Sequence, residues 1–173
     1  KKKKKIAYAK KLGIDFIICD HHRPGAEIPE AVAVLDPKRE DCDYPYKELC
    51  GCGVGFKLIQ AMEQEKGLPV KTLVPYLDLV ATAIGADIVP ITGENRVLAF
   101  YGLDVINTLP RTGIQALIEK VNKDELTITD VVFIIAPRIN AAGRIKHGLH
   151  AVELLTEQDY ERAQEMASGI EGF

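Results

Sequence analysis

A short apolar run that ends in three polar residues constrains the fold of this chain more than any other feature. Residues 16–19 are all apolar, and Asp20, His21 and His22 follow at once. An uninterrupted apolar run of this length is typical of a strand that is buried on both faces of a parallel sheet. A second such run occupies residues 31–35. Because helical patterns surround both runs, the sequence predicts an α/β domain, with a parallel β-sheet core flanked by helices and a helical part after it.

Glycine, proline and apolar periodicity divide the rest of the chain. Gly13 is expected to end a helix over residues 6–12, and residues 38–48 are expected to form a loop. The run 131–135 fits either a strand or a helix, and we expect Pro137 to Asn140 to end it. Further helices are predicted over residues 56–66, 70–86, 95–107, 112–121 and from 149 onward.

Composition places the chain among ordinary globular proteins. It has 173 residues, of which 47% are hydrophobic, and a net charge of -3, which gives no global attraction to nucleic acid. It contains no apolar run long enough for a membrane span and no secretory leader, so we expect a cytoplasmic protein with no membrane partner. Its four cysteines are therefore interpreted as reduced packing residues. Residues 1–5 are all lysine, and we interpret them as added or unassigned residues rather than as a basic arm.

Asp20, His21 and His22 form the strongest candidate site. Ligands of open α/β sheets bind at the carboxyl ends of the strands, where these three residues lie. Imidazole nitrogens can bind a divalent metal, and a carboxylate can bind it too or orient an imidazole. The alternative is a pair of solvated turn histidines, but the position directly after a strand favours a metal site.

Asp87 is the second candidate, in a Gly-Ala-Asp-Ile-Val-Pro segment at the end of an apolar helix. A carboxylate among small and apolar residues needs a partner or a metal. A cap for the following segment explains it equally well from spacing alone. Asp78, nine residues earlier on the same predicted helix, is interpreted as structural, with a hydrogen bond to a neighbouring loop.

Two further segments carry weaker signals. Arg138, Asn140 and Arg144 could bind phosphate groups, although a surface loop with ordinary salt bridges explains them as well. The glycines at 51, 53 and 55 match neither common nucleotide-binding fingerprint. We therefore expect these glycines to let a helix start lie close to the loop of the metal site.

Four segments together resemble the DHH superfamily of phosphoesterases, and its RecJ-type exonucleases most closely. Residues 19–25 (CDHHRPG) resemble the motif that names the superfamily, and residues 77–90 (LDLVATAIGADIVP) resemble its later aspartate motif. Residues 49–58 (LCGCGVGFKL) and 136–144 (APRINAAGR) resemble segments particular to the RecJ type. The four occur in the family's order across most of the chain, which makes their joint occurrence specific.

The resemblance implies a two-metal site that holds manganese or magnesium. His21 and Asp87 are then metal ligands, Asp20 ligates or orients, and His22 lies near the metals and the scissile phosphate. The resemblance thus makes His22 and Asp20 the catalytic pair. If one ion binds both His21 and Asp87, their ligand atoms should lie within about 4–5 Å of each other.

The resemblance also implies a substrate and a wider organisation. The family's reaction is 5′-to-3′ hydrolysis of single-stranded DNA in recombination and repair, with repair or replication proteins as possible partners. Arg138, Asn140 and Arg144 would contact the lobe interface or the DNA backbone. Residues 6–148 correspond to a DHH domain that is incomplete at its N-terminal side. Residues 149–173 correspond to the start of a connecting helix toward a second lobe, so we expect this chain alone to be inactive.

Other functions remain to be weighed against this one. A relative within the superfamily could hydrolyse short oligonucleotides, cyclic dinucleotides or pyrophosphate, but the APRINAAGR segment argues against these. A non-catalytic scaffold that binds nucleic acid or a replication partner is the alternative from another class. The intact Asp-His-His and Ala-Asp-Ile-Val-Pro segments argue against it.

Overall fold

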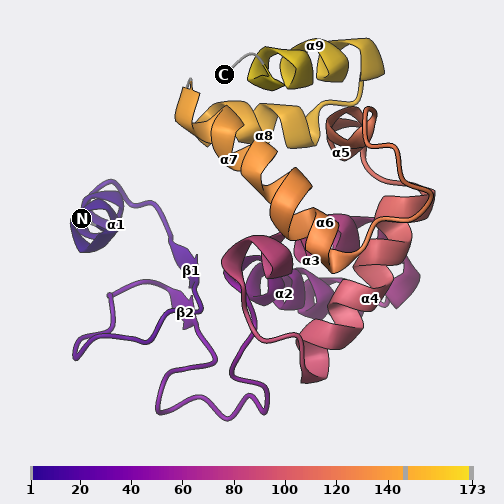
Figure 1. Cartoon of the computed structure of the whole chain (residues 1–173). Helices are drawn as coiled ribbons and strands as arrows, with labels where there is room; N and C mark the ends of the chain where they lie inside the picture. The colour runs from indigo at the N-terminus through magenta and orange to yellow at the C-terminus, as the bar shows by residue number, and fades with distance from the viewer. Residues whose placement is uncertain (1, 146–147, 172–173) are drawn as a thin grey trace.

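The computed structural model describes residues 2–145 and 148–171 and confirms an α/β fold in which helices predominate (Figure 1). Its strands are β1 (Ile17–Cys19) and β2 (Ala33–Leu35). Its α-helices are α1 (Lys2–Lys11), α2 (Gly51–Glu65), α3 (Leu77–Asp87), α4 (Gly93–Thr108), α5 (Thr112–Ile118), α6 (Ile128–Asp130), α7 (Ala136–Ile145), α8 (Gly148–Thr156) and α9 (Tyr160–Glu171). A 3-10 helix (Val70–Tyr76) precedes α3, and a π-helix (Val131–Ile135) joins α6 to α7.

The two strands pair in parallel, as predicted, with Ile17 opposite Ala33 and Cys19 opposite Leu35. The expected burial of β1 on both faces is wrong, since Ile17 is 50% exposed. In the described part of the chain the sheet has two strands, and Ile17 lines an open hollow beside it instead of packing under a covering helix. Cys19 and Leu35, at the carboxyl ends, do pack against a hydrophobic core.

Several helix boundaries differ from the predicted ones. Helix α1 begins within the lysines, which are good helix formers, and Gly13 follows its end at φ +69°. Helix α2 begins at Gly51, ahead of the predicted start, because the Cys50 thiol accepts a hydrogen bond from the Gly53 amide at 3.3 Å and caps it. The predicted helix 70–86 is divided, since its first part, with Pro75, is a 3-10 helix.

The prediction that Pro137 to Asn140 end the 131–135 run is wrong, because the chain continues through them as α7. Proline has no amide hydrogen, and its ring clashes with the carbonyl four residues before it in an α-helix. Here the Ala136 amide bonds to the Val131 carbonyl, five residues back, so the turn just before Pro137 is wider than in an α-helix. The wider turn accommodates Pro137 without ending the helix.

Two hydrophobic clusters hold the helices together, and α3 contributes to both. Val80 and Ile84 of α3 pack with residues of α2 and α4, next to the ends of the strands. Ala81 packs instead with the π-helix and with α5, α7, α8 and α9. The segment predicted as the start of one connecting helix therefore forms two helices, α8 and α9, within this second cluster.

In the described residues, no helix has the length and apolar character needed to cross a membrane.

Candidate metal centre

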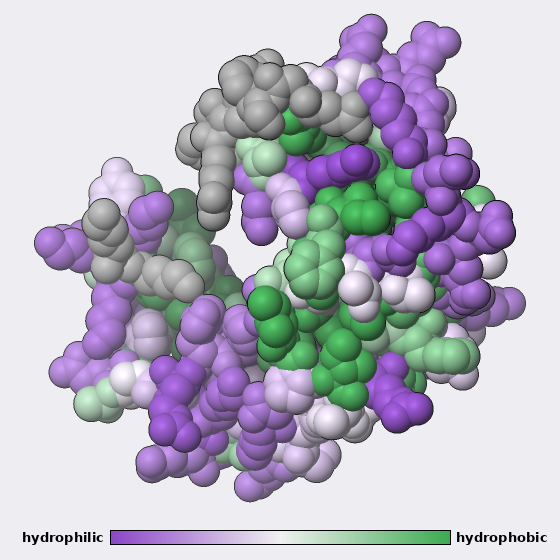
Figure 2. All heavy atoms as spheres, in the orientation of Figure 1, coloured by the Kyte–Doolittle hydropathy of each residue, from purple (hydrophilic) through white to green (hydrophobic). Residues whose placement is uncertain are grey.

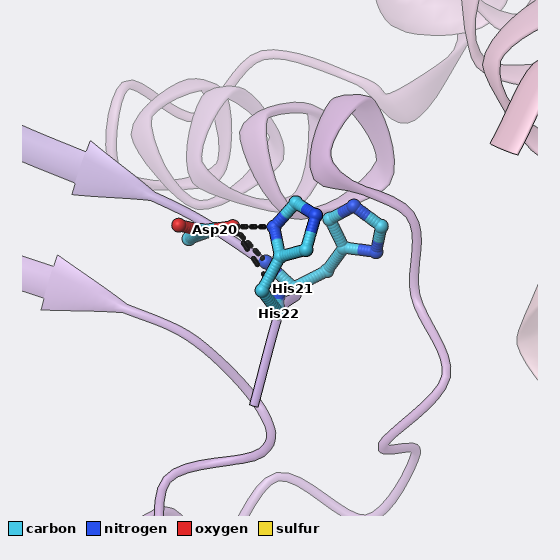
Figure 3. Close-up of side chains that lie close together, drawn as sticks. All are labelled: Asp20, His21 and His22. Carbon is cyan, nitrogen blue, oxygen red and sulfur yellow. Dashed lines mark hydrogen bonds and ion pairs between the residues drawn. The ribbon is translucent and has the colours of Figure 1, made fainter. Parts of the chain in front are cut away.

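The Asp20 carboxylate organises the turn that follows β1 (Figure 3). Its Oδ1 atom accepts hydrogen bonds from the backbone amides of His21 at 2.8 Å and His22 at 3.2 Å. The same oxygen lies 2.6 Å from Nδ1 of His22. Because an ionised carboxylate only accepts hydrogen bonds, Nδ1 of His22 carries the proton. The other ring nitrogen, Nε2, is left to bind a metal or a substrate, on a side chain that is 73% exposed.

His21 lies on the other side of the turn, between the start of α2 and the end of α3. Its Nε2 atom is 3.6 Å from Oδ2 of Asp87, which confirms the expected approach of these two residues. Metal-ligand bonds of about 2.1 Å place two ligands of one ion about 3–4 Å apart. The observed separation is too long for a hydrogen bond and fits one ion between the two atoms.

Glycine at the start of α2 lets His21 take this position. A Cβ atom on Gly51 would lie 3.4 Å from Cδ2 of His21, at the near limit of ordinary van der Waals contact, so the ring lies directly against the helix start. The predicted packing role of the glycine segment is therefore confirmed for Gly51. Of the cysteines in this segment, Cys50 is buried, whereas Cys52 is exposed and does not serve as a packing residue.

Asp87 is the last residue of α3, and the chain turns sharply after it. Ile88 adopts a left-handed conformation with φ 52°, which is rare for a β-branched residue. Its amide bonds to the Gly85 carbonyl and ends the helix. Strained backbone of this kind concentrates at functional sites, where the surrounding structure holds it in place.

Asp20, His21 and His22 each offer one ligand atom, and these atoms lie within 4.8 Å of one another. No other residues in the described part of the chain form such a group. Asp87 does not belong to this group of three, and its contact with the group is the approach of its Oδ2 atom to Nε2 of His21. The site is thus elongated, with Asp87 and His21 at one end and Asp20 and His22 at the other.

A hollow of about 680 Å³ lies beside the Asp20 and His22 end of this site. Phe16 and Ile17 give it an apolar wall, and Arg23 lies on its lining. Figure 2 shows an opening between the part of the molecule that carries α1 and the sheet and the part built from the later helices. His22 thus faces a space large enough for a ligand.

Known proteins resemble this chain in sequence and in fold. Residues 1–84 match the family described as "DHH family, N-terminal domain". The single-stranded-DNA-specific exonuclease RecJ of Bacillus subtilis (strain 168) is 44% identical over 165 residues, which cover 94% of this chain. The same exonuclease of Escherichia coli (strain K12) is 36% identical over 180 residues, which cover 97% of it. Residues 1–84 of the chain therefore carry the N-terminal domain of the DHH family.

Solved structures of DHH proteins extend the likeness to three dimensions. A crystal structure of exonuclease RecJ bound to manganese matches 98% of this chain with a TM-score of 0.86 and 33% identity, over 42% of its own length. The RecJ of Thermus thermophilus in complex with Mn²⁺ matches 96% of this chain with a TM-score of 0.82 and 32% identity, over 25% of its own length. The chain spans 20% of the Bacillus relative and 31% of the Escherichia relative.

The predicted substrate-binding residues lie on α7 and not in a loop. Arg138 is half-buried, and its guanidinium donates a hydrogen bond to the Leu117 carbonyl near the end of α5. Asn140 is exposed, and the Arg144 side chain lies outside the described residues. Contact of these residues with a substrate stays a prediction, and the observed role of Arg138 is to join α7 to α5.

The interpretation of Asp78 as structural is confirmed. It is fully buried in the first turn of α3 and accepts hydrogen bonds from the Arg111 side chain at 2.9–3.0 Å. Sequence reasoning missed Arg111, and it also missed Asn95, a fully buried residue of α4. Neither residue follows an apolar run or belongs to a recognisable motif. Their roles become visible only from their hydrogen bonds to residues distant in sequence, which the sequence alone does not show.

Proposed function

We propose that this chain is the metal-binding part of an exonuclease that hydrolyses phosphodiester bonds in single-stranded DNA. The observation that carries the proposal is the 3.6 Å approach of His21 Nε2 to Asp87 Oδ2, beside the group formed by Asp20 and His22. The four side chains come from two distant segments and serve no evident packing purpose together. Similarity to RecJ exonucleases over more than 90% of the chain supports the same assignment.

We assign His21, Asp87, Asp20 and His22 as ligands of Mn²⁺ or Mg²⁺. Carboxylate oxygens suit both ions, whereas Mg²⁺ usually binds through carboxylates and water, so the two imidazoles fit Mn²⁺ better. The solved RecJ structures hold Mn²⁺ or Mg²⁺, which supports either choice. When bound, divalent ions supply an activated water molecule and stabilise negative charge on the phosphate.

Asp20 and His22 are the proposed catalytic pair. Asp20 fixes the His22 ring through Nδ1 at 2.6 Å, so the ring orientation is set before any substrate arrives. When no metal occupies it, the exposed Nε2 can donate a hydrogen bond to a phosphate oxygen from a protonated ring, so the atom serves either as a metal ligand or as a proton carrier. Asp20 thereby acts as the orienting partner of His22 as well as a metal ligand.

The exposed face of α7 is the proposed contact with the DNA backbone. The Asn140 side chain is exposed on this helix, and Arg144 belongs to the same helix. Because Arg138 is bonded to the Leu117 carbonyl, we infer that it holds α7 in place. The reaction would serve recombination and repair in the cytoplasm, together with repair or replication proteins. Four free cysteines are consistent with a reducing compartment.

The test is nucleotide release from a 5′-labelled single strand by a protein of the relatives' length that contains this segment. With Mn²⁺ present, we expect rapid release from the single strand and little from the matching duplex. Asp87→Asn should lower the rate by about 100-fold or more, since it weakens a proposed metal ligand. Asp104→Asn, an exposed change of the same chemistry on α4, is the matched control and should leave the rate unchanged.

Other outcomes would replace this proposal. Faster hydrolysis of a cyclic dinucleotide or of pyrophosphate would assign the site to a small-molecule phosphoesterase. Tight binding of single-stranded DNA without hydrolysis, at any Mn²⁺ concentration, would assign it to a binding scaffold. Equal rates for the wild type and Asp87→Asn would remove Asp87 from the site.

A further inference from the structure

Asn95 ties the segment that follows Asp87 to the loop that precedes α2. It lies in the first turn of α4 with none of its surface exposed. Its Nδ2 atom donates hydrogen bonds to the Glu48 carbonyl at 2.6 Å and to the Pro90 carbonyl at 3.0 Å. A side-chain amide nitrogen has two hydrogens, so both are used. One buried side chain therefore joins two backbone segments that are distant in sequence.

The Pro90 segment leads within three residues to Asp87, and the Glu48 segment leads within three residues to Gly51, the helix start that the His21 ring contacts. Pro90 lies three residues after Asp87, where the left-handed Ile88 turns the chain. Glu48 lies three residues before Gly51, against which the His21 ring packs. The bonds of Asn95 therefore tie the chain just after Asp87 to the chain just before the helix start that the His21 ring contacts.

The side chains around Asn95 strengthen the same connection from the surface. The Tyr46 hydroxyl lies 3.3 Å from the Pro90 carbonyl and 3.2 Å from the Thr92 hydroxyl. Gly93 has φ +47°, and a Cβ atom there would lie 2.7 Å from the Tyr46 ring. The Tyr44 hydroxyl donates to Glu94 at 2.6 Å, and burial together with that carboxylate raises the pKa of Tyr44, so the donor stays protonated.

We propose that Asn95 is a positioning residue for the metal centre, which it serves through the backbone without touching His21 or Asp87. The proposal rests on metal binding by these two residues, as assigned above. Productive metal sites need their ligands held to within about 0.5 Å, and loss of a supporting contact commonly weakens metal binding by about 10–100-fold. Asn95 supplies such support because one of its bonds holds the segment that follows Asp87 and the other holds the segment that leads to the α2 start beside the His21 ring.

The experiment is a Mn²⁺ titration of this chain followed by NMR of the histidine ring protons. Mn²⁺ is paramagnetic and broadens the signals of rings that lie close to it. In the wild type we expect the His21 and His22 signals to broaden at Mn²⁺ concentrations that leave His150, on α8, sharp. In Asn95→Ala the same broadening should need about tenfold more Mn²⁺.

Asn107→Ala is the matched control for a general loss of stability. Asn107 also lies on α4, and its Nδ2 atom donates to the Leu103 and Leu126 carbonyls at 3.0 and 2.9 Å, in the other hydrophobic cluster. This variant should unfold at a lower temperature than the wild type yet bind Mn²⁺ as the wild type does. A similar shift of the Mn²⁺ midpoint in both variants would mean that Asn95 has no specific role.

Two results separate this inference from the metal site itself. Unchanged Mn²⁺ binding in Asn95→Ala, with a normal wild-type titration, overturns the positioning role and leaves the site standing. The absence of selective His21 and His22 broadening in the wild type overturns the site. Should Asn95→Ala fail to fold, Tyr46→Phe removes only the exposed hydroxyl contacts to Pro90 and Thr92. It should then raise the Mn²⁺ midpoint in the same direction by a smaller factor, and no rise would refute the role.

Discussion

Removal of the Arg111 side chain should destabilise this protein far more than removal of any surface ion pair. Arg111 Nε and Nη2 donate to the Asp78 carboxylate at 2.9–3.0 Å, and the Arg111 amide donates to it at 3.0 Å. Nη1 donates to the Leu155 carbonyl at 3.1 Å. One side chain thus joins the start of α3, the start of α5 and the end of α8.

The expected cost follows from the burial of Asp78, which has no exposed surface. In Arg111→Ala its carboxylate would keep only hydrogen bonds from the backbone amides of Leu79 and residue 111. Removing one partner of a buried ion pair costs about 3–5 kcal/mol, because an uncompensated charge remains in the interior. At about 2–4 °C per kcal/mol for a chain of this size, the unfolding temperature should fall by about 6–20 °C.

The assay is urea unfolding followed by circular dichroism, together with thermal melts. Glu30→Gln is the control, since the Lys10–Glu30 pair is exposed at both ends (68% and 84%) and should contribute less than about 1 kcal/mol. The double variant Asp78→Leu with Arg111→Leu should recover much of the lost stability, because neither charge remains. A cost below about 1 kcal/mol for Arg111→Ala would refute the reasoning.

Three further predictions concern the site, the isolated chain and pH. In a protein of the relatives' length, His22→Ala should abolish hydrolysis of single-stranded DNA in a nucleotide-release assay. The unfolding temperature should stay within a few degrees of the wild type, since this side chain is 73% exposed. The chain alone should release no nucleotide above a His21→Ala control with Mn²⁺ or Mg²⁺, because two carboxylates and two imidazoles leave most ligand positions of two ions to water and do not fix both ions in place. A hydrogen bond from Lys123 and one from the Thr127 amide lower the pKa of Asp130 from 3.8 to about 2. The stability that this carboxylate contributes is therefore present above pH 3.8 and lost as the pH falls toward 2, and Asp130→Asn should flatten that part of a pH-dependent unfolding curve.

The centre of the site was predictable because its residues follow local rules. Asp20, His21 and His22 come directly after an apolar run, so the strand and the position of the site follow from one short segment. Asp87 stands where an apolar helix must end, and the predicted approach to His21 is found at 3.6 Å. Gly51 could be assigned a packing role because its segment matched no nucleotide-binding pattern.

Other features could not be predicted because they depend on contacts between distant residues. Arg111 lies 33 residues from Asp78, and Glu48, one of the two partners of Asn95, lies 47 residues from it; no periodic pattern links residues at such separations. The exposure of Ile17 depends on which elements cover the faces of the sheet, which a single apolar run does not determine. Pro137 was expected to end a helix, and only the wider π-turn before it explains why it does not.

The position of Asp87 depends on α3 as a rigid element that is held at several points along its length. At its start, Asp78 is bonded to Arg111. Near its end, Gly85 packs so closely on the π-helix that a Cβ atom would lie 2.7 Å from Val131 Cγ1. Beyond its end, Asn95 holds the Pro90 carbonyl. The position of a metal ligand at the end of a helix is fixed only as precisely as the helix itself. None of these three contacts touches the site. Together they hold α3 where Asp87 can share an ion with His21.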